Sequence, residues 1–242
     1  MAATGDSITR AATTGTLPWT DNPAASWSTG TDSRVNSHYL RLLALTPRIL
    51  GKAYNDARSG ARMGDLEGQM GTVVAQKADY VTVEMGGNDI CTSSAGSMTS
   101  VDTFRSQFAA AMARVTSGLP RARIFVASIP NVYRLWEILK DNTVARLTWS
   151  VLSVCQSMLS NPLSTLQADI DRRLGVRQRE IDFNGVLRAV CGQYAQCRYD
   201  DDAVFNRTFT TADVGSWDYF HPSITGQREL AAGTWAKSFW AP

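Results

Sequence analysis

The chain opens on "MAATGDSITR" (residues 1–10), in which Gly5, Asp6 and Ser7 follow a short apolar run. Glycine adopts backbone angles that are closed to other residues, so this order indicates a strand that ends in a sharp bend. A serine just after such a bend lies beside unpaired backbone N–H groups at the start of a helix. Ser7 is therefore either a helix cap or a nucleophile next to oxyanion donors, and the triplet alone does not decide between them.

Apolar runs typical of strands alternate with segments of helical periodicity along the rest of the chain. After the strand before Gly5, we predict strands in residues 48–55, 79–85, 122–130 and 198–205. We predict helices in residues 35–46, 65–76, 101–119 and 223–240, and a mostly helical stretch in residues 132–195. This alternation predicts an α/β fold, a three-layer α/β/α sandwich around a parallel sheet of about five strands. No linker divides the chain, so residues 1–242 are expected to form a single domain.

The composition is ordinary for a globular protein and gives no reason to expect a nucleic-acid partner. Apolar residues make up 44% of the chain and charged residues 19%. The formal net charge is +2, and the cationic residues are scattered rather than clustered. No apolar run reaches the roughly 18 residues that a membrane-spanning helix needs.

The four cysteines are Cys91, Cys155, Cys191 and Cys197, and they permit three disulfide pairings. Cys191 and Cys197 lie close in the sequence, so a bridge between them is favoured, which leaves Cys91 with Cys155. The alternative is four reduced thiols in a cytosolic enzyme. We favour disulfides and a secreted, extracellular protein whose export signal has been removed. None of the cysteines has the spacing or histidine partners of a zinc site, so no metal is expected.

Only two histidines are available as a general base for a serine nucleophile. His38 lies inside a predicted helix with no acid to orient it, and we expect it to be a half-exposed structural residue. His221 follows Asp218 by three residues in "SWDYFHPSITGQ" (residues 216–227). A carboxylate at that spacing can bind one ring nitrogen and leave the other to accept a proton. The alternative is an ordinary helix start that Asp218 caps.

Two further turns follow predicted strands. In "EMGGNDIC" (residues 84–91) the two glycines permit a sharp turn, and Asn88 supplies a side-chain N–H donor. In "NDARSGARMGDL" (residues 55–66) the turn at Gly60 could present a backbone N–H. Because ligand sites of parallel sheets form at the carboxyl ends of the strands, Ser7, Gly60 and Asn88 should converge on one edge. Either turn could also be purely structural.

Taken in order, "GDSIT", "SGARMGDL", "GGND" and "DYFH" resemble the four sequence blocks of the GDSL-type, or SGNH, hydrolase family. The chain has no G-x-S-x-G motif, which argues against an ordinary α/β-hydrolase. The resemblance implies a flavodoxin-like SGNH fold. It also implies Ser7 as nucleophile, His221 as base and Asp218 as its orienting acid. The oxyanion hole would combine the N–H groups of Ser7 and Gly60 with the Asn88 side chain, and no metal or organic cofactor is required.

Longer stretches, including "VEMGGNDIC" and "FHPSITGQRELAAGTW", are similar to the phospholipase B-like branch and to related secreted bacterial lipases. That similarity implies a monomeric enzyme that cleaves lipid esters through an acyl-serine and contacts a lipid surface transiently. The alternatives are a carbohydrate (acetyl) esterase and a non-catalytic binding module on a hydrolase scaffold. Apolar residues of the loops and of the 132–139 segment are candidates for substrate contact or for core packing: Leu17, Trp19, Trp27, Tyr133, Leu135 and Trp136.

Overall fold

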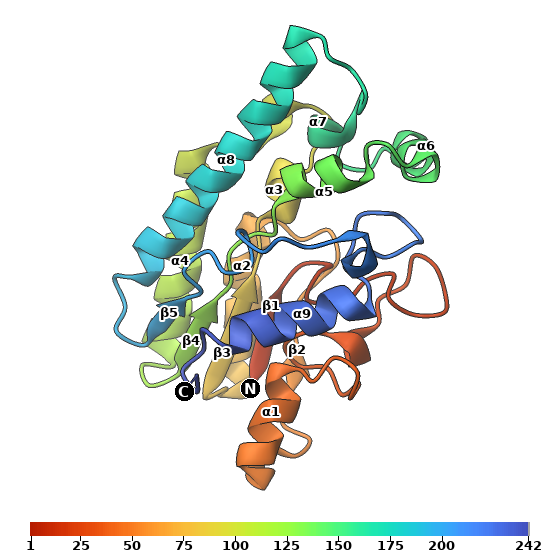
Figure 1. Ribbon diagram of the computed structural model, residues 1–242. Coiled ribbons are helices and arrows are strands. Elements are labelled where there is room, and N and C mark those ends of the chain that lie inside the picture. Colours follow the sequence, from red (N-terminus) through yellow and green to blue (C-terminus); the bar gives the residue numbers. More distant parts are fainter. Residues whose placement is uncertain (242) are drawn as a thin grey trace.

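Five parallel strands form one sheet in the order β2-β1-β3-β4-β5 in the computed structural model, which describes residues 1–241 (Figure 1). The strands are β1 (Ala2–Gly5), β2 (Tyr54–Asn55), β3 (Tyr80–Glu84), β4 (Arg123–Val126) and β5 (Cys197–Tyr199). All four pairings are parallel, so the carboxyl ends of the strands share one edge. The predicted α/β fold with a five-stranded parallel sheet is confirmed.

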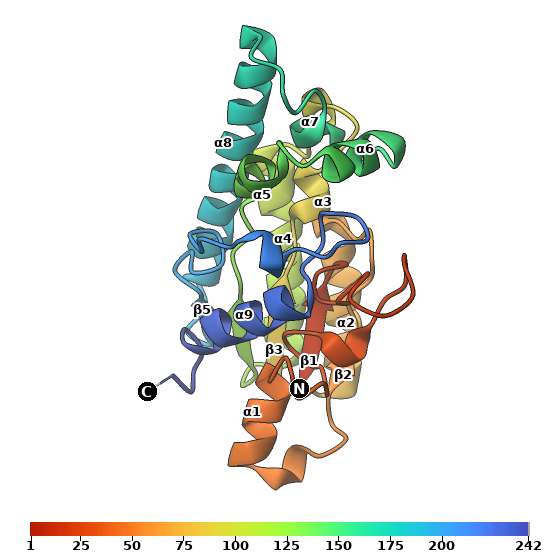
Figure 2. The same ribbon diagram turned by 45° about the vertical axis from the view of Figure 1, so that its right-hand side comes forward.

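Helices cover both faces of the sheet. They are α1 (His38–Leu45), α2 (Leu66–Gln76), α3 (Gly87–Ile90), α4 (Val101–Gly118), α5 (Val132–Leu139), α6 (Thr143–Val151), α7 (Gln156–Leu159), α8 (Gln167–Cys191) and α9 (Ile224–Trp235). Helices α2, α4 and α8 pack side by side on one face, and α1 and α9 lie on the other (Figures 1 and 2). Figure 2 shows α5, α6, α7 and part of α8 extending beyond the carboxyl edge of the sheet.

Two predicted strands differ from those in the structure. Only Tyr54 and Asn55 of the predicted 48–55 strand pair with β1, because Pro47–Ile49 forms a short 3₁₀ helix instead. The last strand pairs through Cys197–Tyr199, and the residues that follow Asp200 form turns. The buried Asp200 carboxylate accepts a hydrogen bond from Ser128 (2.8 Å), which joins the end of β5 to the segment after β4.

The core consists of two apolar clusters, one on each face of the sheet. Side chains alternate along β3, so that Val81 and Val83 join the cluster under α2, α4 and α8, and Tyr80 joins the other. In the first cluster the rings of Phe104 and Phe183 stack with centroids 3.9 Å apart, which joins α4 to α8. Among residues 1–241, no helix is both long and apolar enough to span a bilayer.

His38 is structural, but the expectation that it is half-exposed is wrong. Its side chain has no exposed surface, and its two ring nitrogens hydrogen bond to the hydroxyls of Tyr80 and Thr234, each at 2.8 Å. Trp27 packs edge-on against the imidazole, with the two ring centroids 5.3 Å apart. Burial lowers the pKa of His38 to about 3, so the ring is neutral at physiological pH.

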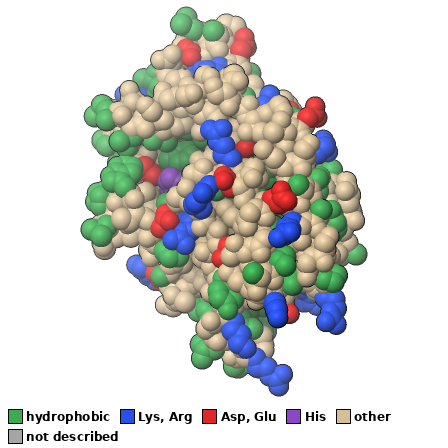
Figure 3. Space-filling view, turned by 180° about the vertical axis from the view of Figure 1, so that it is seen from behind, with side chains coloured by type: hydrophobic (Ala, Val, Ile, Leu, Met, Phe, Trp, Pro, Cys, Tyr) green, Lys and Arg blue, Asp and Glu red, His purple; other side chains and the backbone are tan. Residues whose placement is uncertain are grey.

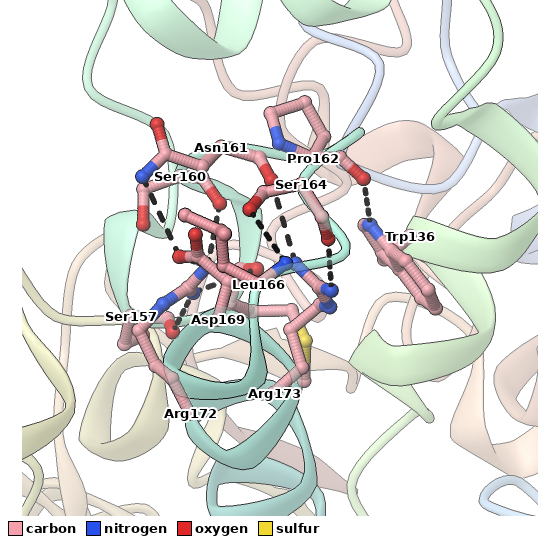
Figure 4. Close-up of polar contacts among 11 residues, drawn as sticks. Trp136, Ser157, Ser160, Asn161, Pro162, Ser164, Leu166, Asp169, Arg172 and Arg173 are labelled. Carbon is pink, nitrogen blue, oxygen red and sulfur yellow. Dashed lines mark hydrogen bonds and ion pairs between the residues drawn. The ribbon is translucent and has the colours of Figure 1, made fainter.

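Disulfides join Cys91 to Cys155 and Cys191 to Cys197. The first connects the end of α3 to the start of α7, and the second closes the turn between α8 and β5. Nearby, the loop between α7 and α8 is held by arginines of α8 (Figure 4). Arg172 donates to the Ser157 and Ser160 carbonyls (both 2.6 Å), and Arg173 donates to the Ser164 carbonyl (2.7 Å).

We expect His38→Gln to destabilise the fold at pH 7 but to make its stability less sensitive to acid. In wild type the unfolded chain binds a proton at this residue below about pH 6.5, whereas the folded protein does not until about pH 3. The free energy of unfolding should therefore fall as the pH drops through this window. Urea titrations should show the gap between wild type and variant narrowing by up to about 1.4 kcal/mol per pH unit between roughly pH 5.5 and 4. A constant gap would contradict the neutral buried state.

The intact mass of the native protein should be lower than that of the reduced chain by the four hydrogens lost from two disulfides. Replacing both Cys91 and Cys155 by alanine should lower Tm more than the same change at Cys191 and Cys197. The first bridge spans 64 residues and the second only 6, and the stabilisation by a bridge, typically about 2–4 kcal/mol, grows with loop length. Four reactive thiols in the native protein would contradict both bridges.

Candidate active site

The nucleophile candidate is placed by the bend at the end of β1. Gly5 has φ +142°, and a β-carbon there would lie 2.2 Å from the Glu84 carbonyl oxygen, so only glycine fits. The Gln69 side chain of α2 binds both backbone polar groups of Gly5: its Oε1 accepts from Gly5 N (2.8 Å) and its Nε2 donates to Gly5 O (2.9 Å). This double contact fixes the bend that brings Ser7 to the carboxyl edge of the sheet.

The structure brings Ser7, His221 and Asp218 into one hydrogen-bonded chain, although the first two lie 214 residues apart. His221 Nδ1–H donates to Asp218 Oδ2 (2.5 Å), which leaves Nε2 to accept the proton of Ser7 Oγ (2.8 Å). Asp218 is buried, and burial raises its pKa. The hydrogen bonds from the His221 ring and from nearby backbone N–H groups outweigh that effect and hold the pKa of Asp218 below its usual value. The carboxylate is therefore ionised and can stabilise a charged imidazole.

The Asp218–His221 turn is held from several sides. Asp218 Oδ1 accepts the backbone N–H groups of Phe220 (2.9 Å) and His221 (3.0 Å). Tyr219 adopts a left-handed conformation (φ +55°), and its carbonyl accepts from the indole of Trp149 in α6 (3.0 Å). Helix α6 thus supports the base without touching the nucleophile.

Asn88 and the Gly60 turn come together at the same edge. Asn88 Nδ2 donates one hydrogen bond to the Ala61 carbonyl (2.9 Å), which joins its loop to the residue after Gly60. Asp89 strengthens this junction by accepting from Met63 N (2.9 Å) and from the Thr99 hydroxyl (2.7 Å).

Three donors remain available around Ser7. Among residues 1–241, the backbone N–H groups of Ser7 and Gly60 have no hydrogen-bond acceptor. The amide of Asn88 uses one of its two N–H bonds on Ala61 and keeps the other. Unpaired donors next to a serine are suited to binding the negative oxygen that forms when a carbonyl is attacked.

A cavity of about 80 Å³ lies beside Ser7 and Asn88. Most of its wall is apolar and comes from the segment after β4, from the 204–222 region and from α9: Ile129, Val132, Leu135, Val204, Phe209, Val214, Phe220 and Leu230. The one arginine in the wall, Arg207, is paired with Glu229 at 3.0 Å. Figure 3 shows a hollow lined by apolar side chains, with a histidine exposed at its edge.

Helix α8 holds the wall segment 129–132. Asn184 Oδ1 accepts from Ile129 N (2.9 Å), and Glu180 Oε1 accepts from Val132 N (3.1 Å). Glu180 is fully buried, and burial raises its pKa well above the usual value. The wall is therefore anchored by two buried side chains that bind its backbone.

The aromatic residues predicted to contact substrate do not line this cavity. Trp27 is 1% exposed and packs in the core, so its predicted substrate contact is wrong. Tyr133 and Trp136 are half-buried on α5; the Trp136 indole donates to the Pro162 carbonyl (2.9 Å) and lies under Arg173 (Figure 4). Trp19 is 58% exposed and lies outside the cavity wall.

Of the candidates for substrate contact, Leu135 does line the cavity, but sequence reasoning missed the rest of the apolar wall. Ile129 and Val132 follow the carboxyl end of β4, where sites of parallel sheets are usually built, so this position was the available signal. Among residues 1–241, histidine, cysteine, aspartate and glutamate side chains do not gather in groups of three that could hold a metal ion.

Comparisons with known proteins agree with this geometry. The family described as GDSL-like Lipase/Acylhydrolase matches residues 1–233. No curated protein sequence matches the chain significantly. Three solved structures illustrate its fold. An extracellular lipase from Streptomyces rimosus is 15% identical with a TM-score of 0.56, and the match covers 98% of each chain. A phospholipase A1 from Streptomyces albidoflavus NA297 is 15% identical with a TM-score of 0.54, again over 98% of each chain.

The third structure is a family two carbohydrate esterase from Clostridium thermocellum in complex with cellohexaose, at 18% identity and a TM-score of 0.56. The match covers 98% of this chain and 62% of that one. Likeness at such identities shows the fold alone. The family match, by contrast, spans nearly the whole sequence and includes every residue of the hydrogen-bonded chain described above. This chain therefore belongs to the GDSL-like lipase/acylhydrolase family of serine esterases.

Proposed function

We propose that this protein is a secreted serine carboxylic-ester hydrolase whose natural substrates are lipid esters. The observation that carries the proposal is the Ser7–His221–Asp218 hydrogen-bonded chain beside an apolar cavity. The two disulfides support secretion, because such bonds persist in oxidising surroundings. The proposal includes a single domain over residues 1–242 that works as a monomer.

In the first half of the reaction, Ser7 Oγ attacks the ester carbonyl while its proton moves to His221 Nε2. Asp218 stabilises the imidazolium that results. The carbonyl oxygen becomes an oxyanion, which accepts from the N–H groups of Ser7 and Gly60 and from the remaining N–H of Asn88. When the tetrahedral intermediate collapses, the alcohol oxygen leaves with the proton from His221, and the acyl group stays on Ser7.

In the second half, water takes the place of the alcohol. His221 accepts a proton from water, the hydroxyl attacks the acyl carbonyl, and the same donors bind the oxyanion again. The acid then leaves, and the proton returns from His221 to Ser7 Oγ. His221 therefore accepts and returns every proton that is transferred in the two halves of the reaction.

The lining of the cavity favours an acyl chain over an acetyl group on a sugar. Its wall is mostly hydrocarbon, and the Arg207 charge is already neutralised by Glu229. Each methylene buried there contributes about 0.8 kcal/mol, whereas sugar hydroxyls would lose their hydrogen bonds to water. A carbohydrate esterase is the alternative outcome of the substrate test below.

Exposed apolar side chains lie outside the cavity as well. Val144, Leu147 and Val151 form an exposed stripe on α6, opposite the buried Ala145 and Trp149. A helix that is apolar on both sides is unusual at a protein surface. The proposal therefore includes transient contact of α6 with the surface of aggregated lipid.

Ser7→Ala should lower kcat by about 10⁴–10⁶-fold, because no other side chain can form the acyl intermediate. Asn88→Ala should cost about 10²–10³-fold as one lost oxyanion donor, with little change in KM. Hydrolysis of p-nitrophenyl butyrate and labelling by a fluorophosphonate probe would measure both effects. Comparable turnover by wild type and Ser7→Ala would rule out the assignment.

Val214→Trp should narrow the cavity and shift preference toward short acyl chains. Val214 is half-buried in the wall, so the larger ring can extend into the cavity. Excluding two to three methylenes should reduce kcat/KM for C8–C16 p-nitrophenyl esters about 10–100-fold relative to the C2 ester. Leu45→Trp, on the exposed face of α1, is the matched control and should leave the profile unchanged.

Phosphatidylcholine and acetylated xylan would complete the substrate panel. Release of fatty acid from the phospholipid without deacetylation of xylan is the expected result. A preference for the C2 ester together with rapid deacetylation of xylan would replace the lipid assignment with the carbohydrate one.

A further inference from the structure

Two carboxyl groups lie buried together next to Ser7, and the reaction described above uses neither of them. Asp6 and Glu84 are each 1% exposed. They come from the adjacent ends of β1 and β3, where Gly5 pairs with Glu84. The two side chains lie close enough for each to shift the pKa of the other. Among residues 1–241, no N–H or O–H group donates to either Glu84 carboxyl oxygen, although both oxygens are buried.

Two buried carboxylates side by side would repel each other, and neither could donate a hydrogen bond, so the pair is stable only when it holds a proton. In the described part of the chain, no lysine or arginine is among the groups that shift the pKa of either carboxyl. The titratable groups that do are His221, which attracts Asp6, and Asp89, which repels it. Burial raises the pKa of Asp6 to about 6 and that of Glu84 well above its usual value. Asp6 accepts a backbone N–H from Ile8, whereas Glu84 accepts none, so the negative charge of the pair belongs on Asp6 and the proton on Glu84.

Asp6 connects the two turns that hold the reacting groups. Its Oδ1 accepts from Ile8 N (2.9 Å), which closes the turn around Ser7. Its Oδ2 faces Gly87, where a β-carbon would lie 3.5 Å away, so the backbone next to Asn88 packs closely on this carboxylate. Asp6 also lines the cavity beside Ser7. Any movement of Asp6 would shift the nucleophile relative to an oxyanion donor.

We propose that Asp6 and Glu84 are positioning residues for ester hydrolysis: the proton on Glu84 holds Asp6 in place, and the Asp6 carboxylate fixes the Ser7 turn and stabilises the positive charge that develops on His221. The inference rests on the proposed function, since it assigns a role within that reaction. Asp218 orients His221 through Nδ1, and Asp6 adds a second negative charge that makes no hydrogen bond to the ring.

Four variants separate this role from simple packing. Glu84→Gln retains an N–H donor for Asp6 and cannot ionise, so kcat should stay within about threefold of wild type. Glu84→Leu has a similar volume but no donor, and kcat should fall about tenfold or more at nearly unchanged KM. Asp6→Asn removes the charge near His221. Asp56→Asn is the matched control, because Asp56 is a half-buried carboxyl whose pKa is also raised by burial but which lies outside the site.

The deciding measurement is the dependence of kcat/KM on pH with p-nitrophenyl butyrate. In wild type Asp6 loses its negative charge as the pH falls through about 6, because burial raises its pKa to about that value. Asp6→Asn cannot titrate there, so its acid limb should lie at lower pH by about half to one unit. A merely structural role would lower the profile without moving this limb. An unmoved limb in Asp6→Asn, or equal losses of kcat in Glu84→Gln and Glu84→Leu, would overturn the proposal.

The shared proton has a readout that needs no activity. An infrared difference spectrum at pH 7, wild type minus Glu84→Gln, should contain the carbonyl stretch of a protonated carboxylic acid. Its absence would show that Glu84 is ionised and would contradict the pair directly. If wild type hydrolyses no ester but shows this band, the proposed function fails while the carboxylic acid pair stands.

Discussion

The parallel pairing of β1 with β3 is the constraint on which the site depends. Gly5 lies opposite Glu84, so both strands end at the same level and their turns leave the sheet side by side. The turn after β1 begins at Gly5, and the turn after β3 begins at Gly86. Both glycines have positive φ, and a β-carbon at either position would collide with neighbouring atoms. A shift of register by two residues would move Ser7 past Asn88 by about 7 Å, and one oxyanion donor would be lost.

The same edge holds carboxyl groups in opposite states. Asp218 remains ionised because it accepts several N–H groups, whereas burial without any N–H donor raises the pKa of Glu84 well above its usual value. Environment, rather than residue type, assigns these roles. A buried group without N–H partners is stable only when it is neutral, so adding an unpaired charge here would cost more than the site could gain from it.

Short stretches of the sequence predicted the strands and contacts that form within those same stretches. The apolar runs around Tyr80–Glu84 and Arg123–Val126 predicted β3 and β4, and the spacing of Asp218 and His221 predicted their hydrogen bond. The errors concern contacts between distant segments. His38 is buried because Tyr80 and Thr234, 42 and 196 residues away, satisfy its ring nitrogens, and no spacing reveals that pairing. The placement of Trp27 in the core and the contact of Asp6 with Glu84 are likewise set by the packing of separate segments.

The cavity beside Ser7 is held in shape by a different part of the fold from the one that holds the reacting residues. Its wall after β4 is positioned by Asn184 and Glu180 of α8, which contact neither Ser7 nor His221. These side chains are buried and bind backbone N–H groups, so the wall cannot move without leaving a buried donor unpaired, at a cost of about 1–3 kcal/mol. The reacting residues and the cavity wall are thus held in place by different segments of the chain. A substitution in α8 can therefore alter the cavity wall without changing the hydrogen bonds that join Ser7, His221 and Asp218.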